Sequence, residues 1–189
     1  DRGTTYNDFL PSLNLVADFG DGYMIRFGAA KTLARARIDD MRAAASAGVD
    51  PTTRTWSGGG GNPELEPWRA TSYDLSFEKY FGEASYVALA GFYKSLDTYV
   101  YTQTIEYDFT GFTNTGTVQP ISNIGSYSAP ANGDGGWLRG GEFSTALEGN
   151  LLSDSLDGFG LLINGSYTES SIKPDGPNTS ATATLPGLS

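Results

Sequence analysis

Hydrophobic and polar side chains alternate along several stretches of this chain, with a period of two residues. The clearest example lies within residues 71–81, where Tyr73, Leu75 and Phe77 alternate with Asp74, Ser76 and Glu78. A period of two places the two sets on opposite faces of a β-strand. The same period predicts further strands over residues 12–19, 23–30, 85–101, 139–148 and 159–167.

The segments between these strands differ in length at the two ends of the predicted sheet. Short Gly-containing turns at residues 20–22 and 82–84, and a connector at 149–157, join consecutive strands at one end. Long loops before residue 71, at residues 103–137 and from residue 173 onward lie at the other end. Within the first of these loops, the acidic start, Ala-rich middle and terminal Gly of residues 39–48 predict one short helix.

The pattern therefore predicts an all-β fold, an antiparallel meander of about six long strands with long loops at one end. Short turns at one end and long loops at the other are typical of bacterial outer-membrane barrels. A soluble sandwich also clusters loops at one end, but it rarely needs a strand as long as residues 85–101.

Composition excludes several classes of function. The formal net charge of -10 disfavours binding to the phosphate backbone of nucleic acid. The chain has no cysteine and no histidine, which removes thiolate chemistry, His-dependent triads and His-based zinc sites. Paired carboxylates such as Glu142 and Glu148 lie along one predicted strand with nothing that marks a cleft. We therefore expect no catalytic residues, no metal site and no cofactor.

A Pro-framed element stands directly before the strand at residues 71–81. Residues 62–67 read Asn-Pro-Glu-Leu-Glu-Pro, and each proline removes a backbone donor and favours an extended preceding residue. This run resembles the asparagine-proline-acid-leucine-x-proline element that precedes a barrel strand in TonB-dependent outer-membrane receptors. Residues 11–35, and residues 139–143 with 156–161, resemble further segments of that barrel in the same order. Two positions depart from the family pattern, Ala36 in place of a common proline and Trp68 in place of a common glutamate.

The resemblance implies a fold and a function. Receptors of this family are 22-stranded barrels filled by an N-terminal plug, and a segment before the plug binds TonB. Residues 1–189 are then expected to be a partial barrel in the outer membrane, without the plug, the first strands and the last strands. The implied function is TonB-dependent uptake of a scarce nutrient, such as a siderophore, cobalamin or a carbohydrate. The implied partners are outer-membrane lipid, the plug, the TonB complex and the nutrient.

Two sets of residues are candidates for function within this framework. The polar positions of the strands are expected to face the barrel lumen; they are Asn14, Asp18, Arg26, Asp74, Glu78, Lys94, Glu142, Glu148 and Asn164. Residues in or beside the long loops are candidates for nutrient contact, because an aromatic ring with a cation suits many ligands; they are Trp56, Trp68, Arg69 and Trp137. The simpler interpretation of Trp68 and Trp137 is an interfacial belt at the barrel rim.

Two other classes of protein remain open. The first is a soluble or surface-attached antiparallel β-domain that binds carbohydrate through its loop tryptophans. A membrane wall requires a continuous apolar band on one face, whereas a soluble sandwich requires a buried core between two sheets. The second is a passive porin, which agrees with the strands but not with the element at residues 62–81.

Overall fold

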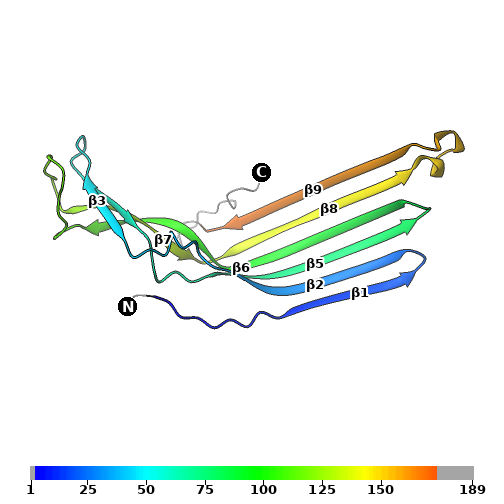
Figure 1. Ribbon diagram of the computed structural model, residues 1–189, viewed down its shortest axis with the longest axis horizontal. Helices are drawn as coiled ribbons and strands as arrows, with labels where there is room; N and C mark the ends of the chain where they lie inside the picture. The colour runs from blue at the N-terminus through cyan, green and yellow to red at the C-terminus, as the bar shows by residue number, and fades with distance from the viewer. Residues whose placement is uncertain (1–2, 174–189) are drawn as a thin grey trace.

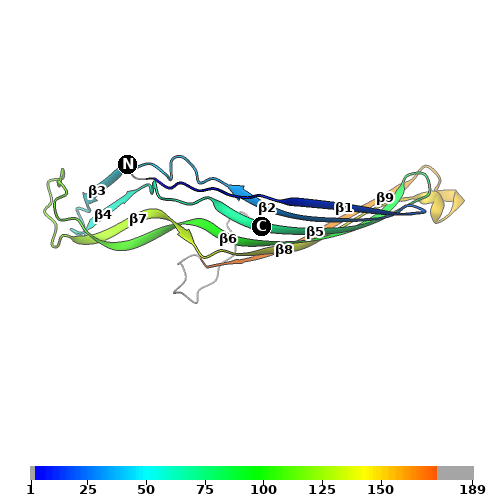
Figure 2. The ribbon, with the colours of Figure 1, turned by 90° about the horizontal axis from the view of Figure 1, so that it is seen from below.

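The fold is a long, curved sheet that forms a single layer (Figures 1 and 2). The computed structural model describes residues 3–173 of the chain. These residues form nine strands: β1 (Ser12–Gly20), β2 (Tyr23–Ala34), β3 (Ala45–Val49), β4 (Trp56–Gly60), β5 (Trp68–Phe81), β6 (Ser85–Asp108), β7 (Ile124–Gly133), β8 (Gly136–Glu148) and β9 (Gly160–Ile172). Two 3₁₀ turns, Gly149–Leu151 and Asp154–Leu156, lie between β8 and β9.

Six of the strands form one wall. They pair in the order β1-β2-β5-β6-β8-β9, every pair is antiparallel, and the short connections join them at one end. We call this part the wall; it uses the first half of β6, up to Leu96. The predicted antiparallel meander of about six long strands is therefore confirmed.

The other three strands continue the sheet beyond the wall (Figure 1). The second half of β6, from Tyr99 onward, pairs with β7; β7 pairs in parallel with β4, and β4 pairs with β3. We call these four segments the extension. It occupies the end of the sheet at which the sequence predicts long loops, opposite the short connections.

The register of the wall separates two faces. One row of directly paired residues runs across the sheet through Val16, Arg26, Ser76, Ala90, Glu142 and Ser166. The next row runs through Leu15, Phe27, Leu75, Gly91, Gly141 and Tyr167. Because successive residues of a strand point to opposite faces, the first row lies on what we call the polar face and the second on the apolar face.

A β-bulge lets β6 serve both parts of the sheet. Leu96 pairs with Ala70 and Thr98 with Arg69, so Asp97 is the extra residue. The inserted residue shifts the alternation by one position, which puts Tyr99 on the same side as Leu96. Tyr99 is only 2% exposed and packs with Ala70, Leu96 and Ile172 in the small apolar core at this junction.

The connection between β7 and β8 requires a glycine. Both strands pair with the same edge of β6, β7 beyond the bulge and β8 before it. Gly135, between the two strands, has φ of +78°, and a Cβ there would overlap the carbonyl oxygen of Leu96. Glycine is therefore the residue that suits this position.

Two expectations for the loops are wrong. Residues 39–48 do not form a helix: a single turn at residues 38–41 is followed by β3, which pairs with the Gly-rich β4. Cross-strand pairing has overridden the local helix propensity of the Ala-rich run. Residues 103–137 are not one long loop either, because β6 continues to Asp108 and β7 covers Ile124–Gly133. Of the expected loop from residue 173 onward, residues 174–189 lie outside the described part of the chain.

At the short-connection end, one carboxylate bridges strands that are distant in sequence. An oxygen of Glu148, at the end of β8, accepts hydrogen bonds from the backbone N–H of Glu83 and Ala84 at 3.2 and 3.1 Å. The same oxygen accepts from the Ser85 hydroxyl at 3.0 Å, and the Glu148 N–H donates to that hydroxyl. This carboxylate therefore fixes the turn between β5 and β6.

Replacing Glu148 with Ala is expected to loosen this turn. Two backbone donors lose a charged acceptor, so amide hydrogen exchange at positions 83 and 84 should become about tenfold faster. Hydrogen exchange followed by mass spectrometry on the membrane-reconstituted protein measures this. Glu83→Ala, in the same turn, is the control and should leave exchange close to that of the parent. Equal exchange in the two variants contradicts the bridging role.

Candidate transport wall and its extension

The nine polar residues that the sequence singles out share one face of the wall. The rows of paired residues that contain them include Asn14–Gly28–Asp74, Asp18–Met24–Glu78 and Ser144–Asn164. These rows lie on the same face as Arg26 and Glu142. Five of the nine are carboxylates and two are cations, so the polar face is acidic. In the middle of this face lies a hollow of about 560 Å³ lined by Asn14, Arg26, Asp74, Ser76 and Glu142, among others.

The charges on the polar face differ in how they are paired. Arg26 donates to Glu78 at 2.9 Å, and the Tyr80 hydroxyl donates to the other oxygen of Glu78 at 2.8 Å. Within residues 3–173, Asp74 and Glu142 form no hydrogen bond or ion pair. Two carboxylates of the hollow therefore remain open to an incoming cation or donor.

The opposite face exposes large hydrophobic side chains in a continuous band. Thirteen of them are between 37% and 68% exposed: Leu13, Leu15, Phe19, Tyr23, Tyr73, Leu75, Phe77, Leu89, Tyr93, Phe143, Leu161, Ile163 and Tyr167. Soluble monomers rarely expose an apolar patch that spans a whole sheet. This face is suited to contact with hydrocarbon.

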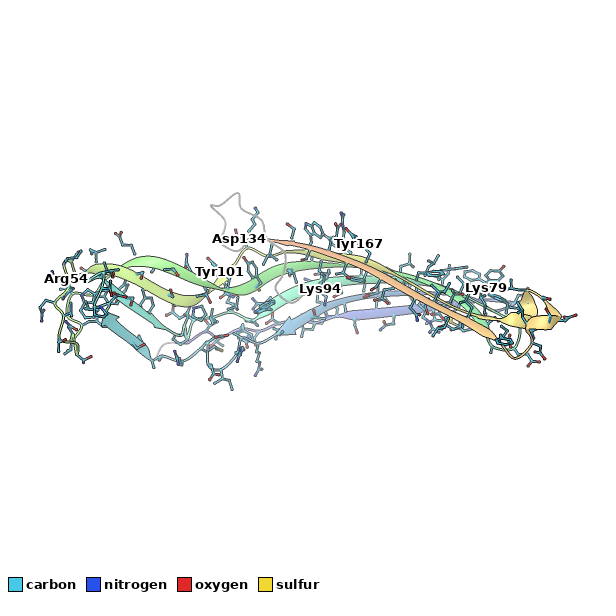
Figure 3. All side chains as sticks on the ribbon, turned by 90° about the horizontal axis from the view of Figure 1, so that it is seen from above. Arg54, Lys79, Lys94, Tyr101, Asp134 and Tyr167 are labelled. Carbon is cyan, nitrogen blue, oxygen red and sulfur yellow. The ribbon has the colours of Figure 1, made fainter. Side chains whose placement is uncertain are left out.

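The charged residues of the apolar face lie toward its two ends. At the short-connection end, the Lys79 ammonium lies 3.6 Å from the centre of the Tyr23 ring and donates to the carbonyl oxygen of Asp21. Toward the other end, Arg139 lies 4.6 Å from the Trp137 ring and forms an ion pair with Glu169. Long cationic side chains that turn away from an apolar band are characteristic of membrane boundaries. Side chains leave the sheet on both sides in Figure 3, with Lys79 near one end and Arg54 at the other.

The extension has its own aromatic core. Trp56 stacks on Phe109 with ring centres 5.3 Å apart and an interplanar angle of 12°, and the two residues are 3% and 1% exposed. Tyr107 meets Phe109 edge-on at 5.1 Å. A Cβ at Gly58 would lie 2.9 Å from the Phe109 ring, so the Gly-rich sequence of β4 permits this close packing.

Two carboxylates order the turns at the outer end of the extension. Asp50 accepts hydrogen bonds from the N–H groups of Thr52 and Thr53, each at 2.8 Å, and these bonds lower the pKa of Asp50. Asp108 accepts from the hydroxyl of Thr110 at 2.7 Å and from its N–H at 2.9 Å, which lowers the pKa of Asp108. Both carboxylates thus stay ionised and hold their turns at neutral pH.

The Pro-framed element at residues 62–67 ties the extension to the wall. The Asn132 side chain, on β7, accepts from the N–H of Glu66 and donates to its carbonyl, both at 2.9 Å. The Asn62 side chain donates to the Pro130 carbonyl at 3.2 Å. Leu65 is buried at 1% exposure. The element therefore replaces a strand at the edge of β7 and leads directly into β5.

The four candidate ligand residues do not come together. Trp56 is buried in the aromatic core of the extension, and Trp68 packs edge-on against Tyr99 at 6.3 Å. Arg69 is held between Asp8 at 2.7 Å and Glu66 at 2.6 Å. Trp137 lies on the apolar face beneath Arg139, as an interfacial belt residue would.

Sequence reasoning missed a different group of residues. Beyond the bulge, Tyr99, Tyr101, Gln103 and Ile105 continue the polar face of the wall into the extension, and Tyr127 pairs with Ile105. A hollow of about 270 Å³ lies here, lined by Asn62, Glu64, Gln103, Ile105 and Tyr127, among others. The alternation of residues 99–107 indicates a strand, but the Thr- and Gly-rich composition of residues 103–137 favoured the prediction of a loop.

The fold and the two faces define a class of protein: one wall of a transmembrane β-barrel of the outer-membrane type. The family model described as TonB dependent receptor-like, beta-barrel, matches residues 1–189, and the chain belongs to this family. A search of curated proteins gave no match. Members of the family are outer-membrane β-barrels that serve TonB-dependent transport, and they are transporters rather than enzymes. The predicted family is confirmed.

The structure contains no helix, within residues 3–173, that is long and apolar enough to cross a membrane.

Replacing Asn132 with Ala is expected to loosen the extension from the wall. The Glu66 N–H loses its bond to the Asn132 side chain, which is worth about 1 kcal/mol, so exchange of this amide should become about fivefold faster. Hydrogen exchange with fragmentation resolves this amide. Asn123→Ala is a matched control in the same part of the chain, because the Asn123 side chain bonds only to Thr110 among the described residues. Unchanged exchange in Asn132→Ala contradicts the proposed tie.

Proposed function

We propose that the wall is part of a closed barrel whose polar face lines the lumen and whose apolar face meets lipid. The separation of the two faces carries this proposal, because every polar candidate shares one face. The edge strands β1 and β9 each pair with one neighbour only among the described residues. Unpaired edges are not tolerated in a bilayer, so further strands would complete the barrel, up to the 22 of a receptor of this family.

The acidic lumen face would then meet the plug of the same receptor. Asp74 and Glu142, the two unpaired carboxylates in the hollow of the polar face, are suited to cationic or hydrogen-bonding groups of such a domain. TonB would act on the plug from the short-connection end, since short turns of outer-membrane barrels are periplasmic. Movement of the plug would open a path along this face.

The extension would stand on the extracellular side and contact the nutrient. The hollow of about 270 Å³ combines the Tyr127 ring and the Gln103 amide with the Glu64 carboxylate, which are groups that orient a small polar ligand. The hollow continues the polar face, so a ligand released there would enter the lumen directly. A siderophore, cobalamin and a carbohydrate all remain candidates.

Nutrient contact by Trp56, Trp68, Arg69 and Trp137 stays a prediction. The observed contacts of these residues favour supporting roles. Trp56 would need the extension to open before its ring met a ligand, because it is only 3% exposed. The ion pairs of Arg69 instead hold residues near Asp8 against the base of the extension.

The soluble carbohydrate-binding domain has no support in the structure. Such a domain requires a core between two sheets, whereas the six strands of the wall form one layer (Figure 2) that exposes large hydrophobic side chains on its apolar face. The buried hydrophobic residues are few: Trp56, Leu65, Ala70, Leu96, Tyr99, Phe109 and Ile172. All of them lie in the extension or at its junction with the wall.

The assignment of the faces is tested by spin labels in the complete receptor, reconstituted in lipid. Leu75→Cys and Leu89→Cys should carry labels accessible to oxygen, which concentrates in hydrocarbon. Ser76→Cys and Ala90→Cys, the next residue on each strand, should not. Paramagnetic relaxation by oxygen and by a water-soluble nickel chelate measures both environments. Equal oxygen accessibility at all four positions, or the reverse order, contradicts the lumen and lipid assignment.

The transport proposal predicts that loss of the Gln103 and Tyr127 side chains lowers nutrient uptake. Cells expressing the complete receptor would be given labelled ferric siderophores, cobalamin and oligosaccharides, with and without TonB. The transported compound should require TonB, and Gln103→Ala with Tyr127→Ala should reduce its binding about tenfold, as loss of two contacts would. Thr104→Ala, one position along β6 and on the other side of the sheet, is the control. Equal uptake in this control and in the double variant removes the hollow from the nutrient site.

A further inference from the structure

The hollow of the extension is built from three segments of the chain. Gln103 and Ile105 on β6 pair directly with Ala129 and Tyr127 on β7, so these four side chains leave the sheet on the same side. Ala129 and Ala131 are small, which leaves space beside the Tyr127 ring. The Pro-framed element completes the lining. The hollow is therefore a space between the sheet and this element.

Glu64 is the one charged residue among those that line the hollow in the described part of the chain. Its N–H donates to Oδ1 of Asn62 at 2.9 Å, and its carbonyl oxygen accepts from the Thr4 hydroxyl at 3.1 Å. Asn62 in turn donates to the carbonyl oxygen of Pro130 at 3.2 Å. Glu64 itself is exposed, and its carboxylate forms no hydrogen bond or ion pair with any residue that the structure describes. A carboxylate on a fixed backbone, without such a partner, is available to a ligand.

The other polar groups of the hollow suit a cation. The Tyr127 ring is backed by Tyr107, whose ring centre is 5.2 Å away, and cations are attracted to the face of an aromatic ring. The Gln103 side chain offers an amide oxygen as an acceptor. Arg42 packs against Gly61 of the lining, but it is not itself among the lining residues. A protonated amine, which is both a donor and a cation, is the complement of these groups.

The polar face that leads away from the hollow carries the same sign of charge. Five carboxylates and two cations stand among its nine predicted lumen residues. Arg26 is paired with Glu78, so Lys94 is the other cation, whereas Asp74 and Glu142 form no ion pair within the described residues. A surface of this sign attracts cations and repels anions. The wall therefore favours a positively charged ligand over an anionic one.

We propose that the nutrient is a small compound that carries a protonated amine, and that the hollow recognises this amine. The ammonium group lies between the Glu64 carboxylate and the Tyr127 ring and donates to the amide oxygen of Gln103. The inference rests on the proposed function of the hollow as the nutrient site and adds the chemical class of the nutrient. It narrows the candidates to amine-bearing siderophores and amino sugars, and it excludes anionic ferric complexes.

Matched pairs of probes that differ only in acetylation of the amine test this class. The complete receptor in detergent micelles would be titrated by calorimetry with the trimer of glucosamine and the trimer of N-acetylglucosamine. The second pair is the ferric complex of a linear trihydroxamate with a free terminal amine, and the same complex with that amine acetylated. In at least one pair, the amine form should bind about tenfold more tightly than the acetylated form. Failure of both amine forms to bind, or no preference for the amine form in either pair, overturns the proposal.

The role of Glu64 is tested by removing its charge alone. Glu64→Gln keeps the shape of the side chain and should abolish the preference for the amine form. Glu106→Gln is the matched control, because Glu106 lies on the same stretch of β6 as Gln103 but on the other side of the sheet. This control should keep the preference of the parent. A preference that persists in Glu64→Gln overturns the assignment of the amine to Glu64.

The double variant Gln103→Ala with Tyr127→Ala separates a failure of this inference from a failure of the proposed function. If the double variant binds the probes as tightly as the parent, the hollow is not the nutrient site, and both proposals fail. If the parent binds the two forms of a pair equally and the double variant loses both, the hollow remains the nutrient site and only the amine class is wrong. Loss of the amine preference in both Glu64→Gln and the double variant supports the two proposals together.

Discussion

The register between neighbouring strands is the constraint on which the wall depends. Alternation gives each strand a polar and an apolar side, but only the register aligns those sides across six strands. A slip of one residue in any pair would exchange the two sides of a strand. It would move Arg26 or Lys94 into the apolar band, where a cation near mid-bilayer costs roughly 2–4 kcal/mol. The short connections help to prevent such a slip, because the Asp21–Gly22 turn has positive φ at both residues, which is the geometry of a tight hairpin.

The bulge at Asp97 extends this constraint beyond the wall. Without the inserted residue, Tyr99 would point to the apolar side of the sheet. The polar side of β6 would then not continue beyond the bulge into Tyr99 and Tyr101. With it, Tyr99 and Tyr101 continue on the side that we assign to the lumen, and ring centres 5.7 Å apart bring the two into contact. One strand thereby carries both the membrane wall and the surface of the extension. The hydrogen bonds of Asn132 and Thr98 to the Pro-framed element hold the two parts in a fixed relation.

The wall was predictable from sequence because its signal is local. Leu75 and Glu78 reveal their faces through their immediate neighbours, and membrane strands repeat that pattern over many residues. The extension was not predictable in the same way. β3 is an Ala-rich pentamer with helical propensity, and β4 is mostly glycine, so only their pairing makes them strands. The predicted loop position of Trp56 likewise gave no sign that its ring stacks on Phe109 in the core of the extension, because that contact joins residues far apart in the chain.

The distribution of buried residues shows that the wall and the extension are stabilised in different ways. The buried hydrophobic side chains belong to the extension or to its junction with the wall, whereas the membrane part of the wall exposes large side chains on its apolar face. In water, that part would gain little from the hydrophobic effect, and its ladder hydrogen bonds alone contribute modestly. Hydrocarbon on one face reverses this balance, because every backbone group must then be paired within the sheet. The wall is thus stabilised by its surroundings and tolerates little variation in register. The extension, in contrast, is stabilised by its own core.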